Sequence, residues 1–184
     1  MEQKSSPLMK SSVTNGVYLG LIGILISVVI WAGGLIESMG IFGGAIIGLV
    51  SFVISCILIF IFTKTYRNKE LGGFISFGEA FKFAMLVVIV STLISVFYNY
   101  IFHSFIAPDY MQNLMAVMQQ KTMTFMESKG VPEAQMDAAL EKFQEIPTIW
   151  KTLRQTAVTG IISGAIISLI VAAIVKKKEE DVIE

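Results

Sequence analysis

The stretch KTYRNKELGGFISFGEAFK, residues 64–82, decides how the rest of this chain is arranged. It is the main polar break in the first hundred residues, and it carries Lys64, Arg67, Lys69 and Lys82. Long apolar runs lie on both sides of it. Because Lys and Arg concentrate in the cytoplasmic loops of membrane proteins, we expect the basic loop 63–82 to be cytoplasmic. The sidedness of every other segment follows from that placement.

Composition favours lipid as the solvent of this chain. Hydrophobic residues make up 54% of its 184 residues and charged residues 15%, against roughly 45–50% and 25% in soluble domains. The formal net charge is zero, so bulk electrostatics give no reason to expect nucleic-acid binding. The length favours one domain, residues 1–184.

Four apolar runs are long enough to span a membrane, at about 16–36, 41–62, 83–106 and 157–175. About twenty helical residues cross roughly 30 Å of hydrocarbon. The first run follows a basic start, as a signal peptide would. It is longer than the usual apolar region of such a peptide and lacks a convincing small-x-small cleavage site, so we interpret it as a retained span.

Local signals mark where helices start around the basic loop. Gly72-Gly73 allows the chain to turn without steric cost. Ser76 followed by Glu79 matches a capping box, in which each side chain bonds the backbone N–H of the other residue. The third helix is therefore predicted to start at Ser76. Thr148 is a candidate cap for the last helix.

The segment 107–155 between the third and fourth runs has a different pattern. Methionines recur near helical spacing from Pro108 to Lys129, which predicts an amphipathic helix. Gly130 suits its C-terminal cap, and a second short helix is predicted between Pro132 and Pro147. The methionines singled out as a candidate partner surface are Met111, Met115, Met118 and Met126.

The distribution of basic residues sets the predicted topology. Nine lie in the segments assigned inside and five in the segment assigned outside. The inside set is Lys4, Lys10, Lys64, Arg67, Lys69, Lys82, Lys176, Lys177 and Lys178, and the outside set is Lys121, Lys129, Lys142, Lys151 and Arg154. This bias predicts a multi-pass protein with both termini cytoplasmic and the insertion 107–155 periplasmic.

The expected fold is an all-α membrane protein. Four transmembrane helices form a bundle, with a short amphipathic helical hairpin between the third and fourth spans. Three spans carry a Gly-x-x-x-Gly spacing, which lets another backbone approach closely. The pairs are Gly16/Gly20, Gly44/Gly48 and Gly160/Gly164. Packing inside one bundle and packing between two copies of the chain both remain open for them.

The segment GGFISFGEAFK, the hydropathy around it and the Pro108-Asp109 step after the third span resemble a known family. It is the bacterial membrane protein family catalogued as domain of unknown function 4199. The resemblance covers nearly the whole chain. It implies a bacterial inner-membrane location and brings no activity, cofactor or catalytic residue.

Two kinds of function are compatible with this pattern. A structural or accessory protein that binds a partner or itself fits the methionine-rich helix, since methionine surfaces adapt to varied contacts. Those methionines are equally suited to packing on one another. The alternative is a small transporter or channel subunit that acts as an oligomer. The spans lack the mid-membrane Asp, Glu, Lys and Arg typical of transporters and carry scattered Ser, Thr and Asn instead.

Catalysis has little support in the sequence. His103 is the only histidine, with Asp109 nearby and Glu37 expected at a similar depth, and a histidine with carboxylates can do acid–base chemistry. A histidine at a membrane boundary has a simpler explanation as an amphipathic residue. Cys56 lies alone in an apolar run, which excludes an internal disulfide. We therefore predict no enzymatic activity, no cofactor and no metal site.

Overall fold

The computed structural model describes residues 7–39, 42–141, 143 and 146–177. Helices account for nearly all of this part of the chain. In chain order they are α1 (Pro7–Ala32), α2 (Leu35–Ser38), α3 (Gly43–Glu70), α4 (Phe77–Ile101), the π-helix η1 (Phe102–Ile106), α5 (Tyr110–Ser128), α6 (Glu133–Glu141) and α7 (Ile149–Val175).

Four of these segments are long and apolar enough to cross a membrane: α1, α3, α4 with η1, and α7. The all-α class and the four spans predicted from the sequence are confirmed, and the chain is a multi-pass membrane protein. Several helices run beyond the apolar stretches, but α1 ends at Ala32, before the predicted boundary at 36. Gly34, with φ of 55°, separates it from the short helix α2. α1 already includes Pro7, the first described residue, and proline fits the first turn of a helix, where its missing N–H is not needed.

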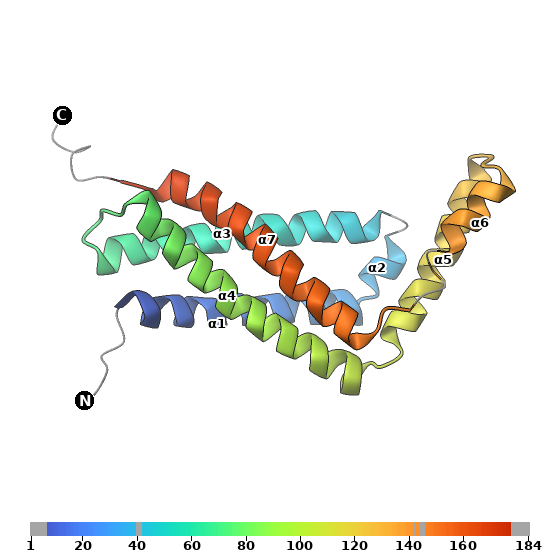
Figure 1. Ribbon diagram of the computed structural model, residues 1–184, viewed down its shortest axis with the longest axis horizontal. Helices are drawn as coiled ribbons and strands as arrows, with labels where there is room; N and C mark the ends of the chain where they lie inside the picture. The colour runs from blue at the N-terminus through green and yellow to red at the C-terminus, as the bar shows by residue number, and fades with distance from the viewer. Residues whose placement is uncertain (1–6, 40–41, 142, 144–145, 178–184) are drawn as a thin grey trace.

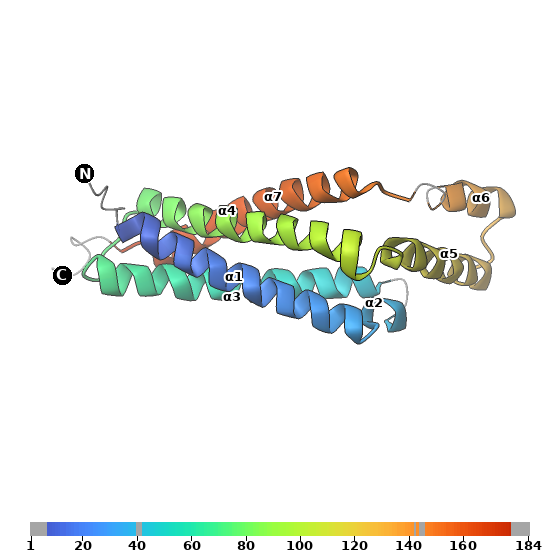
Figure 2. The same ribbon diagram turned by 90° about the horizontal axis from the view of Figure 1, so that it is seen from below.

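The four long helices form a bundle in which α4 lies between α1 and α7 (Figures 1 and 2). α1 begins and α7 ends at the same end of the bundle, beside the α3–α4 loop. We call this the terminal end. At the opposite end, the arm end, the long helices spread apart (Figure 2). α5 and α6 extend beyond them (Figures 1 and 2).

Polar contacts tie the elements together at the terminal end. Arg67 Nη1 of α3 donates a 2.9 Å hydrogen bond to the backbone oxygen of Val175, at the C-terminus of α7. Ile75 and Lys177 exchange two backbone hydrogen bonds of 3.0 Å. Lys177 Nζ also lies 5.6 Å from the ring centre of Phe74. A cation near a helix C-terminus is favourable because the free carbonyls carry partial negative charge.

The most tightly packed part of the protein lies in the half of the bundle nearest the terminal end. Ile59, Phe83 and Val171 are at most 2% exposed. The ring of Phe83 stacks on that of Tyr66, with ring centres 4.3 Å apart and planes 8° from parallel. The core cluster continues through Ile75, Ala80, Ala84, Val87, Val88, Ile167, Ala172 and Val175. All but one of these residues belong to α3, α4 or α7.

The α3–α4 turn has the local structure that its sequence predicts. Gly72 and Gly73 have φ of 67° and 98°, values that glycine adopts without steric cost. Ser76 Oγ accepts a 3.3 Å bond from the backbone N–H of Glu79. Glu79 Oε2 accepts a 3.1 Å bond from the backbone N–H of Ser76. The capping box and the start of the third helix are confirmed.

Ser76→Ala is expected to lower the stability of the protein by about 1 kcal/mol, the usual cost of removing a capping hydroxyl. The thermal unfolding midpoint in detergent micelles, followed by tryptophan fluorescence, measures this loss. Ser76→Thr keeps a hydroxyl acceptor and serves as the control. If the threonine variant loses as much as the alanine variant, the hydrogen bond to the Glu79 amide is not the source of the stability.

The segment that joins α4 to α7 forms an arm, which we define as α5 and α6. No residue of either helix is fully buried. The arm touches the bundle through η1, α2 and the start of α3. Lys121 Nζ donates to the backbone oxygen of Glu37, and the rings of Phe42 and Phe125 meet edge to face at 6.2 Å. α7 then starts at Thr148, whose Oγ1 accepts from the backbone N–H of Lys151 as predicted.

Candidate functional site

The centre of the bundle holds a cavity of about 210 Å³ to which all four long helices contribute. We call it the central cavity. Aliphatic side chains such as Ile22, Ile54 and Ile167 form part of its wall. The rest of the wall is polar, because hydroxyl groups from three helices, α3, α4 and α7, line it. They belong to Ser51, Ser55, Ser91, Thr92, Ser95 and Ser163.

Half of these hydroxyls are satisfied by their own helix. Ser55, Ser91 and Ser163 donate to the backbone oxygens of residues three or four positions earlier, at 2.7–2.9 Å. This is the usual arrangement of serine inside a helix. The side-chain hydroxyls of Ser51, Thr92 and Ser95 make no hydrogen bond to any described residue. These three are available to a molecule inside the cavity.

A second cavity, of about 260 Å³, adjoins the first toward the arm end. Gly23, Ile26 and Ser51 line both of them. We call it the aromatic cavity, since its walls include Trp31, Phe102 and Tyr110 together with Asn99 and His103. Asn99 Nδ2 donates 2.9 Å to the backbone oxygen of Ser95. The side-chain oxygen of Asn99 therefore remains an acceptor.

His103 is held at the rim of the aromatic cavity by ring contacts. It lies in the π-helix η1, a wider turn that often occurs at functional positions. Its ring stacks on Tyr110 with centres 6.3 Å apart and meets Phe102 edge to face at 5.1 Å. The pKa of the Tyr110 hydroxyl is raised, first by burial and then by the negative charge of Glu37. Tyr110 therefore stays neutral and able to donate a hydrogen bond.

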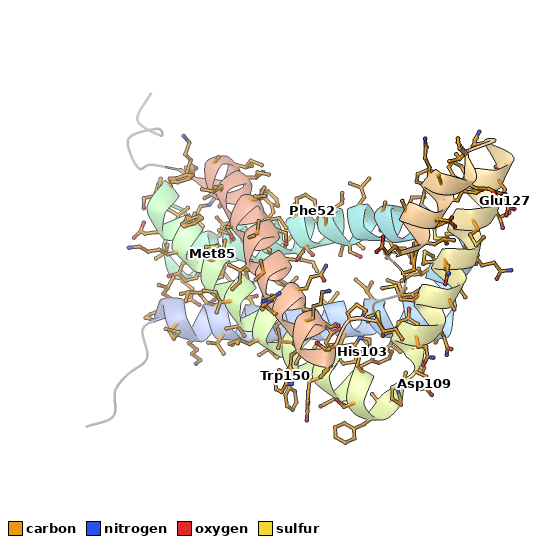
Figure 3. All side chains as sticks on the ribbon, turned by 45° about the vertical axis from the view of Figure 1, so that its right-hand side comes forward. Phe52, Met85, His103, Asp109, Glu127 and Trp150 are labelled. Atoms are coloured by element: carbon orange, nitrogen blue, oxygen red, sulfur yellow. The ribbon has the colours of Figure 1, made fainter. Side chains whose placement is uncertain are left out.

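A third cavity, of about 160 Å³, lies between η1, the start of α5 and the start of α7. We call it the arm cavity. Met111, Gln112 and Thr152 are among its lining residues, and His103 borders it as well as the aromatic cavity. Figure 3 marks His103 where the bundle meets the arm, and Trp150 on the adjoining turn of α7. The three cavities follow one another from the middle of the bundle to the arm end.

The glycines predicted to mediate helix packing have different surroundings in the structure. A methyl group at Gly16 or Gly20 would lie within 3.0 Å of side-chain atoms of Val90 or Ile94 on α4. Gly160 and Gly164 of α7 lie as closely against Thr92 and Val88, on another face of α4. In contrast, nothing in the described chain lies within 4 Å of a methyl group placed at Gly44 or Gly48. Those two glycines of α3 are open.

The methionines of the candidate partner surface lie on α5. Met111, Met115, Met118 and Met126 are all half-buried. Met111 lines the arm cavity. Figure 3 shows how far α5 carries the surface from the bundle, with Glu127 at its far end.

The groups considered for acid–base chemistry do not assemble into a relay among the described residues. Asp109 is exposed at the start of α5, and no hydrogen bond joins it to His103. Glu37 Oε2 is buried and has no hydrogen-bond partner among the residues that the structure describes. In the same part of the chain, no three His, Cys, Asp or Glu side chains are close enough to hold a metal ion.

A comparison with known families decides what the chain is related to. Residues 14–177 match the family described as "Protein of unknown function (DUF4199)". The chain belongs to this family. The resemblance recognised in the GGFISFGEAFK segment is thereby confirmed over most of the length. No curated protein and no solved structure matches the chain.

The cavities of this DUF4199 protein were not predicted from the sequence. Its serines, threonine and asparagine are visible in the spans, and a bond along the same helix would explain most of them. In the structure Ser51, Thr92 and Ser95 make no such bond to a described residue. One signal pointed further. Ser51/Ser55 and Ser91/Ser95 are spaced by four residues, which places each pair on one helix face. Two such faces on different spans indicate a shared polar interior only once the helices are known to be neighbours.

Proposed function

We propose that this DUF4199 protein is a non-enzymatic accessory protein of a bacterial inner membrane and that its arm binds another membrane protein. The observation that carries the proposal is the arm itself, two helices that extend past the bundle without one fully buried residue. Short helices in water gain most of their stability from packing an apolar face against another surface. A partner on the half-buried methionine side of α5 would supply that surface.

Charge favours a protein over the bilayer as the occupant. The described residues of α6 include Glu133, Asp137 and Glu141, and no basic residue lies among them. Anionic lipid headgroups attract basic helices rather than acidic ones. Methionine side chains are flexible and polarizable, which suits them to contacts with a protein surface of irregular shape.

The basic residues support an orientation with the terminal end in the cytoplasm and the arm in the periplasm. Within the described ranges, seven basic residues lie at the terminal end and four at or near the arm end. The first set is Lys10, Lys64, Arg67, Lys69, Lys82, Lys176 and Lys177, and the second is Lys121, Lys129, Lys151 and Arg154. The excess of Lys and Arg at one end is the usual signature of the cytoplasmic side.

Photo-cross-linking in native membranes tests the partner proposal. With a benzophenone amino acid at Ala116, an exposed position of α5, we expect one discrete adduct with a second protein. Met115→Ser combined with Met118→Ser should reduce that adduct about tenfold, equivalent to about 1.4 kcal/mol of binding free energy. The matched control changes Asn113 and Gln120, exposed residues of the same helix, to serine and should leave the adduct in place.

Three results would contradict this function. They are adducts with lipid alone, an adduct with a second copy of the chain alone, and an adduct that persists after both methionines are replaced. The same probe at Leu49, an exposed apolar residue of α3, shows how much cross-linking a surface facing the lipid gives without a specific partner.

A second candidate is a transporter or channel subunit that works as an oligomer. The hydroxyl-lined central cavity favours it, since polar groups inside a membrane bundle often mark the path of a solute. The packed core at the terminal end opposes passage through a single chain, because Ile59, Phe83 and Val171 close that half of the bundle. Passage would require this core to separate, whereas partner binding by the arm requires no rearrangement.

A further inference from the structure

We infer that the central, aromatic and arm cavities form one water-filled pocket that binds a small uncharged polar molecule. The pocket is entered from the arm end and closed by the packed core at the terminal end. This inference concerns the interior of the bundle. It goes beyond the proposed function and does not depend on a partner at the arm.

Continuity is the first step of the argument. Gly23, Ile26 and Ser51 line both the central and the aromatic cavity, and His103 lines both the aromatic and the arm cavity. The helices diverge in the same direction, toward the arm end (Figure 2). A molecule that enters beside His103 therefore meets cavity walls all the way to the middle of the bundle.

Hydration is the second step. The hydroxyls of Ser51, Thr92 and Ser95 have no protein partner among the described residues, and each faces the cavity. A polar group left without a hydrogen bond in hydrocarbon costs several kcal/mol. One water needs only about 10–15 Å³ of such space and two to four polar partners. The cavities offer much more than that volume, so water or a polar ligand fills them.

The chemistry of the wall selects the ligand. No Asp, Glu, Lys or Arg lines any of the three cavities in the described chain. A charged solute that reached the central cavity would lose its hydration without gaining an opposite charge from the wall, which is strongly unfavourable. Hydroxyls and the Asn99 amide can both donate and accept hydrogen bonds. These groups beside isoleucine side chains fit a small neutral molecule that carries hydroxyl or amide groups.

The closed end is defined by the same helices. On the side of the central cavity that faces the terminal end, Ile59 and Ile167 belong both to the cavity wall and to the buried core. Phe83, Val87 and Val171 continue that core with at most 2% exposure. The pocket therefore does not continue through the terminal end of the bundle, and a molecule that comes from the water enters it at the arm end.

Cysteine reactivity in lipid nanodiscs tests the water-filled pocket. On a Cys56→Ala background, Ser95→Cys is compared with Val87→Cys in the core and with Leu93→Cys, a residue 65% exposed on the outside of α4. Thiols react as thiolates, and apolar surroundings disfavour the thiolate by raising the pKa of the thiol. We expect iodoacetamide to modify Ser95→Cys about tenfold faster than either control. A rate equal to that of Leu93→Cys would overturn the inference, and Ser51→Cys repeats the test if Ser95→Cys does not fold.

Selectivity for neutral molecules is measured with the same variants. The ratio of iodoacetamide to iodoacetate rates at Ser95→Cys is compared with the ratio at Ser128→Cys, an exposed position at the end of α5. We expect a higher ratio in the pocket, and an equal or lower ratio would overturn the inference that the pocket selects uncharged molecules.

Glycerol or acetamide should slow the modification of Ser95→Cys and leave the modification of Ser128→Cys unaffected. Absence of protection by both would overturn binding of this class. The purified chain suffices, so these results are independent of any arm partner.

Discussion

Replacing Gly164 with leucine is expected to prevent α7 from packing on α4, while the same change at Gly48 leaves the bundle intact. A side-chain methyl at Gly164 would overlap a methyl group of Val88 and lie 2.9 Å from the other. Gly164 and Val88 are both buried on helix interiors, so neither backbone can withdraw without opening the interface. Overpacking by a whole leucine side chain should lower the free energy of unfolding by about 3 kcal/mol or more.

Gly48 supplies the matched control because it belongs to the same type of motif. It lies in α3, and no described atom is within 4 Å of a methyl group placed there. Leucine also has a better helix propensity than glycine, by about 1 kcal/mol of free energy. Gly48→Leu should therefore leave the unfolding midpoint unchanged or raise it slightly. The yield of monodisperse protein in detergent and the thermal unfolding midpoint measure both variants.

A compensating pair checks the stated cause. Gly164→Ala alone should lower the midpoint, and combining it with Val88→Ala should recover part of the loss, because the smaller residue at 88 makes room for the added methyl group. Equal losses for Gly164→Leu and Gly48→Leu would contradict the packing seen around α4. Loss confined to Gly48→Leu would indicate instead that the open glycines of α3 contact a second copy.

The glycine motifs also show where sequence reasoning ends. The spacing Gly-x-x-x-Gly occurs in α1, α3 and α7 and gives the same signal each time. Two of the pairs lie on α4 and the third lies open. Which face of a helix meets a neighbour depends on the arrangement of all the helices, and one helix sequence does not contain that information. Packing inside the bundle and packing between copies therefore stayed alternatives.

Local signals were more informative. The four spans follow from runs of apolar residues, and the starts of α4 and α7 follow from Ser76 and Thr148, whose hydroxyls bond residues only three positions away. Such contacts are contained in a short stretch of sequence. The cavity is the opposite case, because Ser51 of α3 and Ser95 of α4 meet only through the fold. In the sequence alone, a hydrogen bond along the same helix would explain most of these hydroxyls.

Phe83→Ala is the second large change we expect, and it tests the closed end of the bundle. Phe83 is completely buried, and its ring stacks on Tyr66. In a soluble protein such a truncation costs about 3–5 kcal/mol. In a membrane the separated helices still face hydrocarbon, so only the packing part is lost, and we expect about 2 kcal/mol.

Phe97→Ala on the same helix is the control, since its side chain is 65% exposed on the outside of the bundle and has few contacts to lose. Its unfolding midpoint should stay close to that of the unmodified protein, while that of Phe83→Ala falls. We expect a void at residue 83 to extend the central cavity toward the terminal end as well. Phe83 belongs to the same buried cluster as Ile59, and Ile59 lines the cavity. Iodoacetamide should then reach Val87→Cys in the Phe83→Ala protein and not in its parent. If Val87→Cys stays unreactive and the midpoint stays unchanged, the core described here does not close the pocket.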